Sequence, residues 1–357
     1  MKLLVTGASG FIGRHVVAAA LRCGHQVRAV VRPARDLEGL PWHSHPDVEL
    51  ARLDLRSRHC LVQAVGGVDA VVHLAAGMSG TYQDQFRCTV VATENLLEAM
   101  VSAGVHRLVA ISSIAVYDYV RARRRIDENT VLEQHPQDRD DYARTKLIQE
   151  RLVRDFAASH HGVVTILRPG VVFGRDHLWT ARIGARAGNW WCRIGARAPL
   201  PLIYVENLAD AILRAVEQES SAGKTLNLVD DETPTQSRYV AAIAGRLEPP
   251  PVVIGVNFTL MRVLAKLAAW TNRLCFGGRA RLPGLLVSPR LLARCRPLGY
   301  TNQQARDILG WQPRFSLETA LERSFSDVTL LGVPTGASDP DQPVPPHGQT
   351  DACASPT

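Results

Sequence analysis

The sequence KLLVTGASGFIG occupies residues 2–13 and carries the strongest indication of the fold. Its first five residues are mostly apolar, as in a buried parallel strand. Three glycines follow at once, and the apolar periodic run that begins at Ile12 predicts a helix. A second apolar run, at residues 26–31, predicts the next strand. A strand, a glycine-rich turn, a helix and a strand in this order are typical of a doubly wound parallel α/β sheet.

The glycine-rich turn also predicts a dinucleotide site. Glycines let the backbone turn tightly and approach a pyrophosphate, which binds helix N–H groups at the positive end of the helix dipole. The spacing here is GxxGxxG rather than GxGxxG. The residues expected to contact the cofactor are Gly7, Ser9, Gly10, Phe11, Ile12 and Gly13.

The residue after the second strand indicates which cofactor is preferred. An acidic side chain there would bind a ribose 2′-hydroxyl, whereas an Arg suits a 2′-phosphate. Arg32 follows the strand directly, Arg35 comes shortly after it, and the first carboxylate is that of Asp36. The sequence therefore predicts an NAD(P) site with a preference for NADP(H). The alternative, that both Arg are ordinary surface charges, stays open.

Tyr142 and Lys146 form a pattern that can transfer protons. Four residues apart, they lie on one face of a predicted helix, one turn from each other. A nearby ammonium favours the phenolate and lowers a pKa that is normally about 10. Such a Tyr can accept or donate a proton near neutral pH. The pattern also occurs as an exposed pair in ordinary helices, and the glycine-rich N-terminus is what favours chemistry.

Further motifs follow in a fixed order along the chain. They are HLAA at residues 73–76, SSIAVY at 112–117, RPGVVFG at 168–174 and LGWQP at 309–313. With TGASGFIG at the start, the chain resembles the extended short-chain dehydrogenase/reductase family, in its epimerase/dehydratase group, over roughly residues 1–326. The resemblance implies a doubly wound Rossmann sheet with a smaller, mainly helical C-terminal substrate lobe.

The resemblance also assigns roles to individual residues. It implies that Ser113 and Tyr142 are catalytic, and that Lys146 lowers the Tyr142 pKa and holds the nicotinamide ribose. It adds cofactor contacts after the third strand, in the HLAA motif and in the RP motif. These contacts are Asp54, Leu55, Leu74, Ala75, Ala76 and Pro169.

Two departures from the family pattern bear on the reaction. Thr89 stands where the family often has Asn, which leaves open the path by which Tyr142 exchanges its proton with water. Ile114 and Ala115 stand where dehydratases usually carry an Asp-Glu pair after the catalytic Ser/Thr. Elimination needs an acid and a base at the reacting carbons, so we rank dehydration below epimerisation and simple oxidoreduction.

Composition and motif order together predict the domain organisation. We expect a Rossmann domain at residues 1–168, with returning segments near 202–230, and a substrate lobe from 169–201 and 231–326. Residues 333–357 are rich in Pro, Ser, Gly and Gln with little to bury, which predicts a disordered tail. The whole chain has a net charge of +7. The tail holds three Asp and no Lys or Arg, so its net charge is −3 and that of the remaining residues is +10.

The composition also limits the partners. The positive charge could attract anionic substrates such as nucleoside diphosphates, and no motif supports nucleic-acid binding. The seven Cys show no CxxC and no His/Cys ligand spacing, so no metal site is expected. No signal peptide and no apolar run long enough to span a bilayer are seen. We therefore expect a cytoplasmic protein, and by analogy a homodimer formed through the Tyr142 helix and the helix before it.

Two features of the lobe allow several interpretations. RIGARA occurs at residues 182–187 and again at 193–198, with GNWWC between the copies. Its Arg could bind a diphosphate and its Trp could stack on a base or sugar, or the duplication packs as an ordinary loop or helix. Residues 258–270 predict an amphipathic basic helix. Such a helix can lie on a membrane, cover an apolar pocket or, as we favour, pack as an ordinary lobe helix.

The sequence predicts an NAD(P)-dependent epimerase or reductase that interconverts a hydroxyl and a ketone. A nucleotide-linked sugar is the first choice of substrate. The alternative is an NADP-dependent reductase or dehydrogenase of an apolar alcohol, of the hydroxysteroid or dihydroflavonol type, which Arg32 and the apolar helix favour. A non-catalytic NADP(H) sensor would have no need for Ser113, Tyr142 and Lys146.

Overall fold

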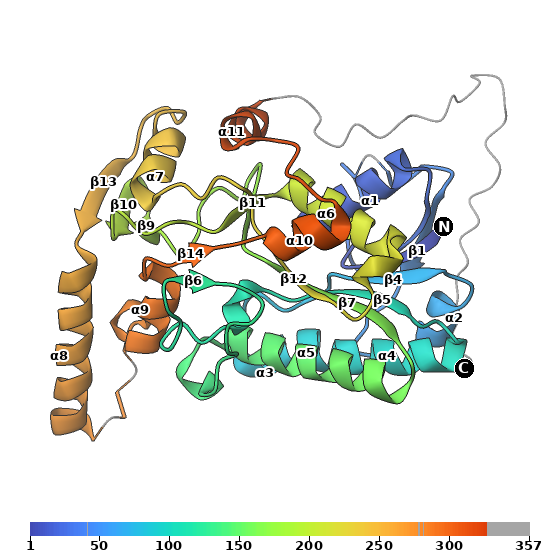
Figure 1. Cartoon of the computed structure of the whole chain (residues 1–357), viewed down its shortest axis with the longest axis horizontal. Helices are drawn as coiled ribbons and strands as arrows, with labels where there is room; N and C mark the ends of the chain where they lie inside the picture. The colour runs from blue at the N-terminus through green and yellow to red at the C-terminus, as the bar shows by residue number, and fades with distance from the viewer. Residues whose placement is uncertain (41, 278, 281, 327–357) are drawn as a thin grey trace.

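The computed structural model describes residues 1–40, 42–277, 279–280 and 282–326 (Figure 1). The tail predicted at residues 333–357 lies outside the described residues.

A seven-stranded parallel sheet forms the centre of the molecule, with strand order β12-β7-β5-β4-β1-β2-β3. The strands are β1 (Lys2–Thr6), β2 (Gln26–Val31), β3 (Val48–Arg52), β4 (Ala70–His73), β5 (Arg107–Ile111), β7 (Val163–Pro169) and β12 (Thr225–Leu228). The order reverses between β1 and β4, and parallel sheets of this kind bind ligands at the carboxyl edge of that point. The predicted doubly wound sheet is confirmed.

Helices cover both faces of this sheet. One layer holds α1 (Phe11–Arg22), α6 (Val205–Glu217) and α10 (Gln303–Leu309), and the other holds α2 (Leu61–Val65), α4 (Ala92–Ala103) and α5 (Asp141–Ser159). Figure 1 shows α4 and α5 below the sheet and α1, α6 and α10 above it.

Side chains that alternate along the strands pack into the cores on both faces of the sheet. Leu3 and Val5 of β1 enter the core beneath α1 and α6, whereas Leu4 enters the core beneath α4 and α5. Successive side chains of a strand point to opposite faces, so the apolar run LLV within KLLVT suits a strand that is buried on both sides.

The C-terminal lobe combines small sheets with helices. Its main elements are β8 (Val171–Phe173), β9 (Gly184–Ala187), β10 (Trp190–Ile194), β11 (Leu202–Tyr204), α7 (Gln236–Ala244), β13 (Val252–Val256), α8 (Phe258–Phe276), α9 (Ser288–Cys295) and α11 (Leu317–Phe325). Shorter elements include α3 (Tyr82–Phe86), β6 (Arg125–Ile126) and β14 (Gly299–Tyr300).

The RIGARA duplication lies on a hairpin. The first copy contains β9, the second begins in β10, and these strands pair antiparallel with Gly184 opposite Arg193. A Cβ on Gly184 would lie 2.1 Å from the Cys192 carbonyl oxygen, so this close strand approach requires glycine. The first copy therefore forms a strand, whereas the second begins in a strand and continues from Gly195 as a loop, so the helix considered from the sequence is not found.

Helix α8 buries fewer of its side chains than the sequence led us to expect. It extends beyond the predicted range, and Ala265 is its one buried residue. The ordinary packing favoured from the sequence therefore holds for one side of this helix only. Across the described part of the chain, none of the helices is both long and apolar enough to cross a membrane.

Candidate active site

A cavity of about 880 Å³ lies at the carboxyl edge of the sheet, where the Rossmann domain meets the lobe. All the site residues predicted from the sequence line it. They are Gly7, Ser9, Gly10, Phe11, Ile12, Gly13, Arg32, Asp54, Leu55, Leu74, Ala75, Ala76, Ser113, Tyr142, Lys146 and Pro169. Segments separated by more than a hundred residues thus meet in one cavity.

The glycine-rich turn forms a cradle at the start of α1. Gly7 has φ +68°, and a Cβ there would lie 3.1 Å from the backbone nitrogen of Ala75. A Cβ on Gly13 would lie 2.1 Å from the Gly7 carbonyl oxygen. The N-cap residue, Gly10, has no side chain to cap the helix, so backbone N–H groups face the cavity. These features fit a dinucleotide pyrophosphate.

Arginines gather at the end of the cavity beside β2 and β3. Arg32, Arg35 and Arg56 all line it together with Asp54. Arg56 Nε donates to Asp54 Oδ2 at 2.9 Å, and this bond holds the pKa of the Asp54 carboxyl below its usual range. Arg52 Nη1 donates to the carbonyl oxygens of Pro33 and Arg35, each at 3.1 Å, and so fixes the loop that carries Arg35. The contribution of Arg56 was missed from the sequence.

Ser113 and Tyr142 come together from different elements. Ser113 follows β5, its side chain hydrogen-bonds Tyr142, and its Oγ accepts from Ala115 N at 3.1 Å. Tyr142 lies in the first turn of α5, whose N-cap Asp140 accepts from Ala143 N at 3.0 Å. Ser113 therefore caps a short 3₁₀ turn and also reaches the phenol.

Burial controls the ionisation of the Tyr/Lys pair. It raises the pKa of Tyr142 to about 12, against the opposing effect of the Ser113 hydrogen bond. It lowers the pKa of Lys146 to about 7, opposed by the nearby Glu150 carboxylate. Lys146 Nζ lies 5.9 Å from the centre of the Tyr142 ring. The expected lowering of the Tyr142 pKa is therefore not found in this arrangement: desolvation raises the pKa, and the Ser113 hydrogen bond, not the Lys146 ammonium, is what opposes the rise.

A buried hydrogen-bonded chain holds the Lys146 ammonium. Its Nζ donates to the Ile111 carbonyl oxygen at 2.7 Å and to Gln149 Oε1 at 2.8 Å. Gln149 Nε2 in turn donates to Thr93 Oγ1 at 3.0 Å. The Thr93 hydroxyl donates to the Thr89 carbonyl oxygen, so its oxygen is left to accept from its neighbours. The amide of Gln149 thereby has one orientation, with its oxygen toward Lys146.

His73 completes this chain at the end of β4. Its Nε2 lies 2.9 Å from Thr93 Oγ1, and its Nδ1 lies 2.8 Å from Thr6 Oγ1. Burial lowers the pKa of His73 to about 3, so the ring is neutral. Because the Thr93 oxygen acts as acceptor, the Nε2–H tautomer fits. Sequence reasoning quoted His73 within a motif but assigned no role to it or to Thr93 and Gln149. The spacing of Gln149 from Lys146, one helical turn, was the available signal.

Thr89 has a backbone partner. Its Oγ1 accepts from Gly77 N at 2.9 Å, from within the π-helical turn Arg87–Val91. Turns of this type occur often at functional sites. The bond holds the loop whose residues Ala75, Ala76 and Met78 line the cavity. Thr89 thus shapes the cavity wall.

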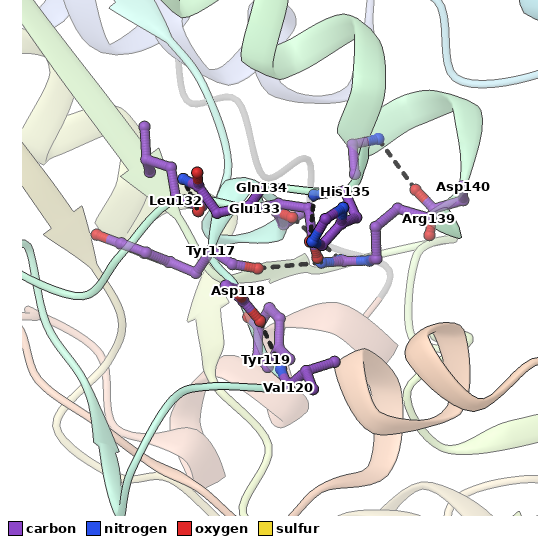
Figure 2. A network of polar contacts seen from close by, with 12 residues as sticks. Tyr117, Asp118, Tyr119, Val120, Leu132, Glu133, Gln134, His135, Arg139 and Asp140 are labelled. Carbon is purple, nitrogen blue, oxygen red and sulfur yellow. Dashed lines mark hydrogen bonds and ion pairs between the residues drawn. The ribbon is translucent and has the colours of Figure 1, made fainter. Parts of the chain in front are cut away.

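A second buried network fixes the start of α5 against the segment after Ser113. Figure 2 shows Arg139, beside the N-cap Asp140, reaching the Tyr117 carbonyl and the Glu133 carboxylate. The distances are 3.0 Å from Arg139 Nη1 to Tyr117 O and 2.9 Å to Glu133 Oε2. Nη2 donates to Ala115 O at 3.1 Å. These bonds tie the two segments that carry Ser113 and Tyr142 together.

The cavity wall near the lobe contains a group of apolar side chains, beside the polar His177 and Thr180. The apolar group includes Met78, Ile114, Ala115, Val171, Val172 and Trp179. Arg182 also lines the cavity, but it donates to Tyr119 Oη at 2.7 Å and to Tyr300 Oη at 3.0 Å. Among the described residues, no group of three or more His, Cys, Asp or Glu is placed to hold a metal ion.

The fold, the glycine cradle and the converging Ser, Tyr and Lys define a class of dinucleotide-dependent oxidoreductases and epimerases. The NAD-dependent epimerase/dehydratase family model matches residues 3–228. The chain belongs to this family, which confirms the resemblance derived from its motifs.

Curated relatives cover nearly the whole chain. A 2-alkyl-3-oxoalkanoate reductase of Stenotrophomonas maltophilia is 30% identical over 90% of this chain and 98% of its own length. A 3-beta-hydroxysteroid dehydrogenase of Mycolicibacterium neoaurum is 27% identical over 92% of each chain. Both are oxidoreductases, and this chain is an enzyme of the same family.

The solved structure of a UDP-glucuronic acid 4-epimerase from Bacillus cereus, in complex with UDP-glucuronic acid and NAD, is also similar. It aligns with a TM-score of 0.69 at 20% identity and covers 91% of this chain and 98% of its own. At that identity, the likeness concerns the fold alone.

Proposed function

We propose that this enzyme is an NADP(H)-preferring reductase that interconverts a ketone and a secondary alcohol on a largely hydrocarbon substrate. The observation that carries the proposal is the convergence of Ser113, Tyr142 and Lys146 in the cavity that also contains the glycine cradle. Curated relatives that act on 3-oxoalkanoates and hydroxysteroids support it.

The residues divide the work of proton transfer. Tyr142 donates a proton to the substrate oxygen during reduction and accepts it during oxidation. Ser113 hydrogen-bonds that oxygen and stabilises its developing charge. Lys146 holds the nicotinamide ribose through the ammonium that Gln149 orients. The nicotinamide ring, when bound, supplies or accepts the hydride. A Tyr142 pKa raised to about 12 keeps the phenol protonated at neutral pH, which suits reduction.

The substrate preference rests on the lobe end of the cavity. Apolar side chains from three segments, including Ile114, Val172 and Trp179, line that end. Hydrocarbon surfaces gain free energy when they leave water for such a wall, about 25 cal/mol per Å². Ile114 and Ala115 also place no carboxylate beside Ser113 for an elimination.

A nucleotide-linked sugar, the first choice from the sequence, is retained as a second candidate because Arg182 lines the cavity. A diphosphate there would have to compete with Tyr119 and Tyr300 for the guanidinium N–H groups. This competition is why we place the apolar substrate first.

The preference for NADP(H) rests on Arg32, Arg35 and Arg56. These three residues line the cavity beside β2 and β3, where a 2′-phosphate would be bound, although the Arg56 guanidinium is shared with Asp54.

Exchange of Tyr142 for Phe tests the catalytic assignment. It removes the proton donor but keeps the ring, so kcat should fall at least about 100-fold. Cofactor affinity should stay within about twofold, because the cradle and the arginines are untouched. Steady-state hydride transfer and cofactor titration measure the two effects. Near-normal turnover in this variant would refute the assignment.

Thermal unfolding with NADP(H) present separates the substrate candidates. A ligand of the native state raises stability by mass action, so a true substrate raises the unfolding temperature. We expect a shift with 2-alkyl-3-oxo acids or hydroxysteroids and none with UDP- or dTDP-sugars. The reverse pattern would favour the nucleotide sugar. No hydride transfer over the whole panel would favour a non-catalytic NADP(H) sensor.

A further inference from the structure

Helix α8 exposes a continuous apolar face. Its inner side packs on the lobe through Phe258, Met261 and Ala265, close to Leu291 and Cys295. Its outer side carries large apolar side chains that are between 41% and 65% exposed, namely Leu260, Val263, Leu264, Leu267, Trp270 and Leu274. Spacings of three and four residues place these six on one face of the helix. Figure 1 shows α8 at the left edge of the molecule, with the rest of the lobe on one side of it.

The neighbouring strand extends this outer face. β13 leads directly into α8 and is an edge strand of the β13-β10-β9 sheet. Its Val252 and Ile254 are 45% and 48% exposed, and Trp190, paired with Val252, is 59% exposed. Apolar patches of this extent on a protein surface mark interaction sites.

The segment that carries β13 and α8 has charge of a single sign. Residues 249–306 contain nine Lys or Arg and no Asp or Glu. Arg262, Lys266 and Arg273 are exposed on α8 itself, and Arg279 is exposed just beyond it. The spacing of four and seven residues between the first three places them along one flank of the helix, beside the apolar row.

We propose that the outer face of α8, with β13, lies on an anionic lipid bilayer. Leu267, Trp270 and their neighbours enter the boundary between headgroups and acyl chains, and the basic flank contacts the lipid phosphates. A second copy of the chain fits less well. A twofold contact would pair the patch with itself, and residues 249–306 of the other copy supply no acidic side chain to balance its basic flank. The proposal is independent of the proposed function.

Sedimentation of the full-length protein with vesicles tests this. One vesicle contains phosphatidylcholine with phosphatidylglycerol, and the other contains phosphatidylcholine alone. We expect binding to the first to exceed binding to the second at least about tenfold and to weaken with added salt.

Substitutions then locate the contact. The double change Leu267→Glu and Trp270→Glu should lower vesicle affinity at least about tenfold, since two apolar groups lose their burial. Joint exchange of Arg262, Lys266 and Arg273 for Ala should lower affinity for the anionic vesicles alone. The matched control is Val62→Glu, which adds a carboxylate at a 44% exposed site on α2, and it should bind like the original protein. All variants should keep their circular dichroism and their NADP(H) affinity.

Three outcomes would overturn the proposal. They are no binding of the original protein to anionic vesicles, equal binding by the Leu267→Glu/Trp270→Glu variant, and a dimer in solution that this variant converts to monomer without any vesicle binding. The last outcome would assign the face to a second copy of the chain.

Discussion

Gln149 is the residue that decides where the Lys146 ammonium points. Its amide oxygen lies 2.8 Å from Lys146 Nζ, and its amide nitrogen is held by Thr93. Lys146 is buried, and burial lowers its pKa to about 7. A neutral Lys146 would hold the ribose less firmly, so activity should decline as the pH rises above that value.

Exchange of Gln149 for Glu should move this decline to higher pH. A carboxylate beside the ammonium favours the charged form, so the pKa of Lys146 rises and the alkaline limb of kcat shifts upward by roughly one pH unit or more. A pH series of hydride-transfer rates measures the shift. Gln149→Met, which adds no charge, is the control and should show no upward shift. An alkaline limb that stays in place in a folded Gln149→Glu variant would contradict the proposed role of the ammonium.

Arg32 is the residue on which cofactor choice depends. Arg32→Ala should weaken NADP(H) binding by roughly 10–100-fold, because a charge-assisted hydrogen bond contributes about 1.5–3 kcal/mol. The affinity for NAD(H), which has no 2′-phosphate, should change by less than about threefold. Calorimetric titration gives both constants. Arg151→Ala, at an exposed position of α5, is the control. An equal loss of affinity for the two cofactors would contradict the assignment of Arg32 to the 2′-phosphate.

At the scale of elements, α5 is the helix that brings the site together. It carries Tyr142, Lys146 and Gln149, and its start is fixed by the Arg139–Glu133 pair. Both side chains of that pair are at most 5% exposed. Its other buried anchor is Glu150, whose Oε2 accepts from Arg168 Nη2 of β7 at 2.6 Å.

Exchange of Glu133 for Ala should lower the free energy of unfolding by about 3–5 kcal/mol. The reason is that the Arg139 guanidinium would stay buried without its carboxylate. Urea denaturation followed by circular dichroism measures the loss. Glu98→Ala breaks the exposed pair with Arg58 and should cost no more than about 1 kcal/mol. Similar losses in the two variants would show that burial of the Arg139 pair is without consequence.

At the scale of the whole molecule, the chain crosses between the Rossmann domain and the lobe several times. Asn207 of α6 donates to Asp230 Oδ1 at 2.9 Å and to the Phe315 carbonyl oxygen at 3.0 Å, which ties late segments to the sheet layer. The cavity lies between the same two parts. The two parts should therefore lose their structure together.

Calorimetry should show one unfolding transition, and NADP(H) should shift it as a unit. At 100 times its dissociation constant, a ligand adds about 2.7 kcal/mol to stability. For a single unit of the size of the described chain, whose unfolding entropy is about 0.7 kcal/mol/K, this corresponds to a rise of roughly 4 °C in the unfolding temperature. Two separate transitions, of which NADP(H) moved only one, would contradict the coupling.

The sequence by itself determined the central architecture and the location of the candidate site. The apolar run at residues 2–6 and the glycines after it suffice for β1 and the cradle, because strand burial and tight turns depend on residues close together in the chain. The motif order predicts that Ser113, Tyr142 and Lys146 share one site.

The tertiary structure alone decided how these groups ionise and what holds them. Tyr142 and Lys146 are only four residues apart in sequence, yet their pKa values depend on desolvation, which distant segments impose. Thr93, on another element, holds the Gln149 amide that accepts from Lys146, and His73 in turn lies against Thr93. The outer face of α8 could not be foreseen either. An apolar helix face is the same in sequence whether a neighbour covers it or not, and only the packing of the whole chain shows that it is left exposed.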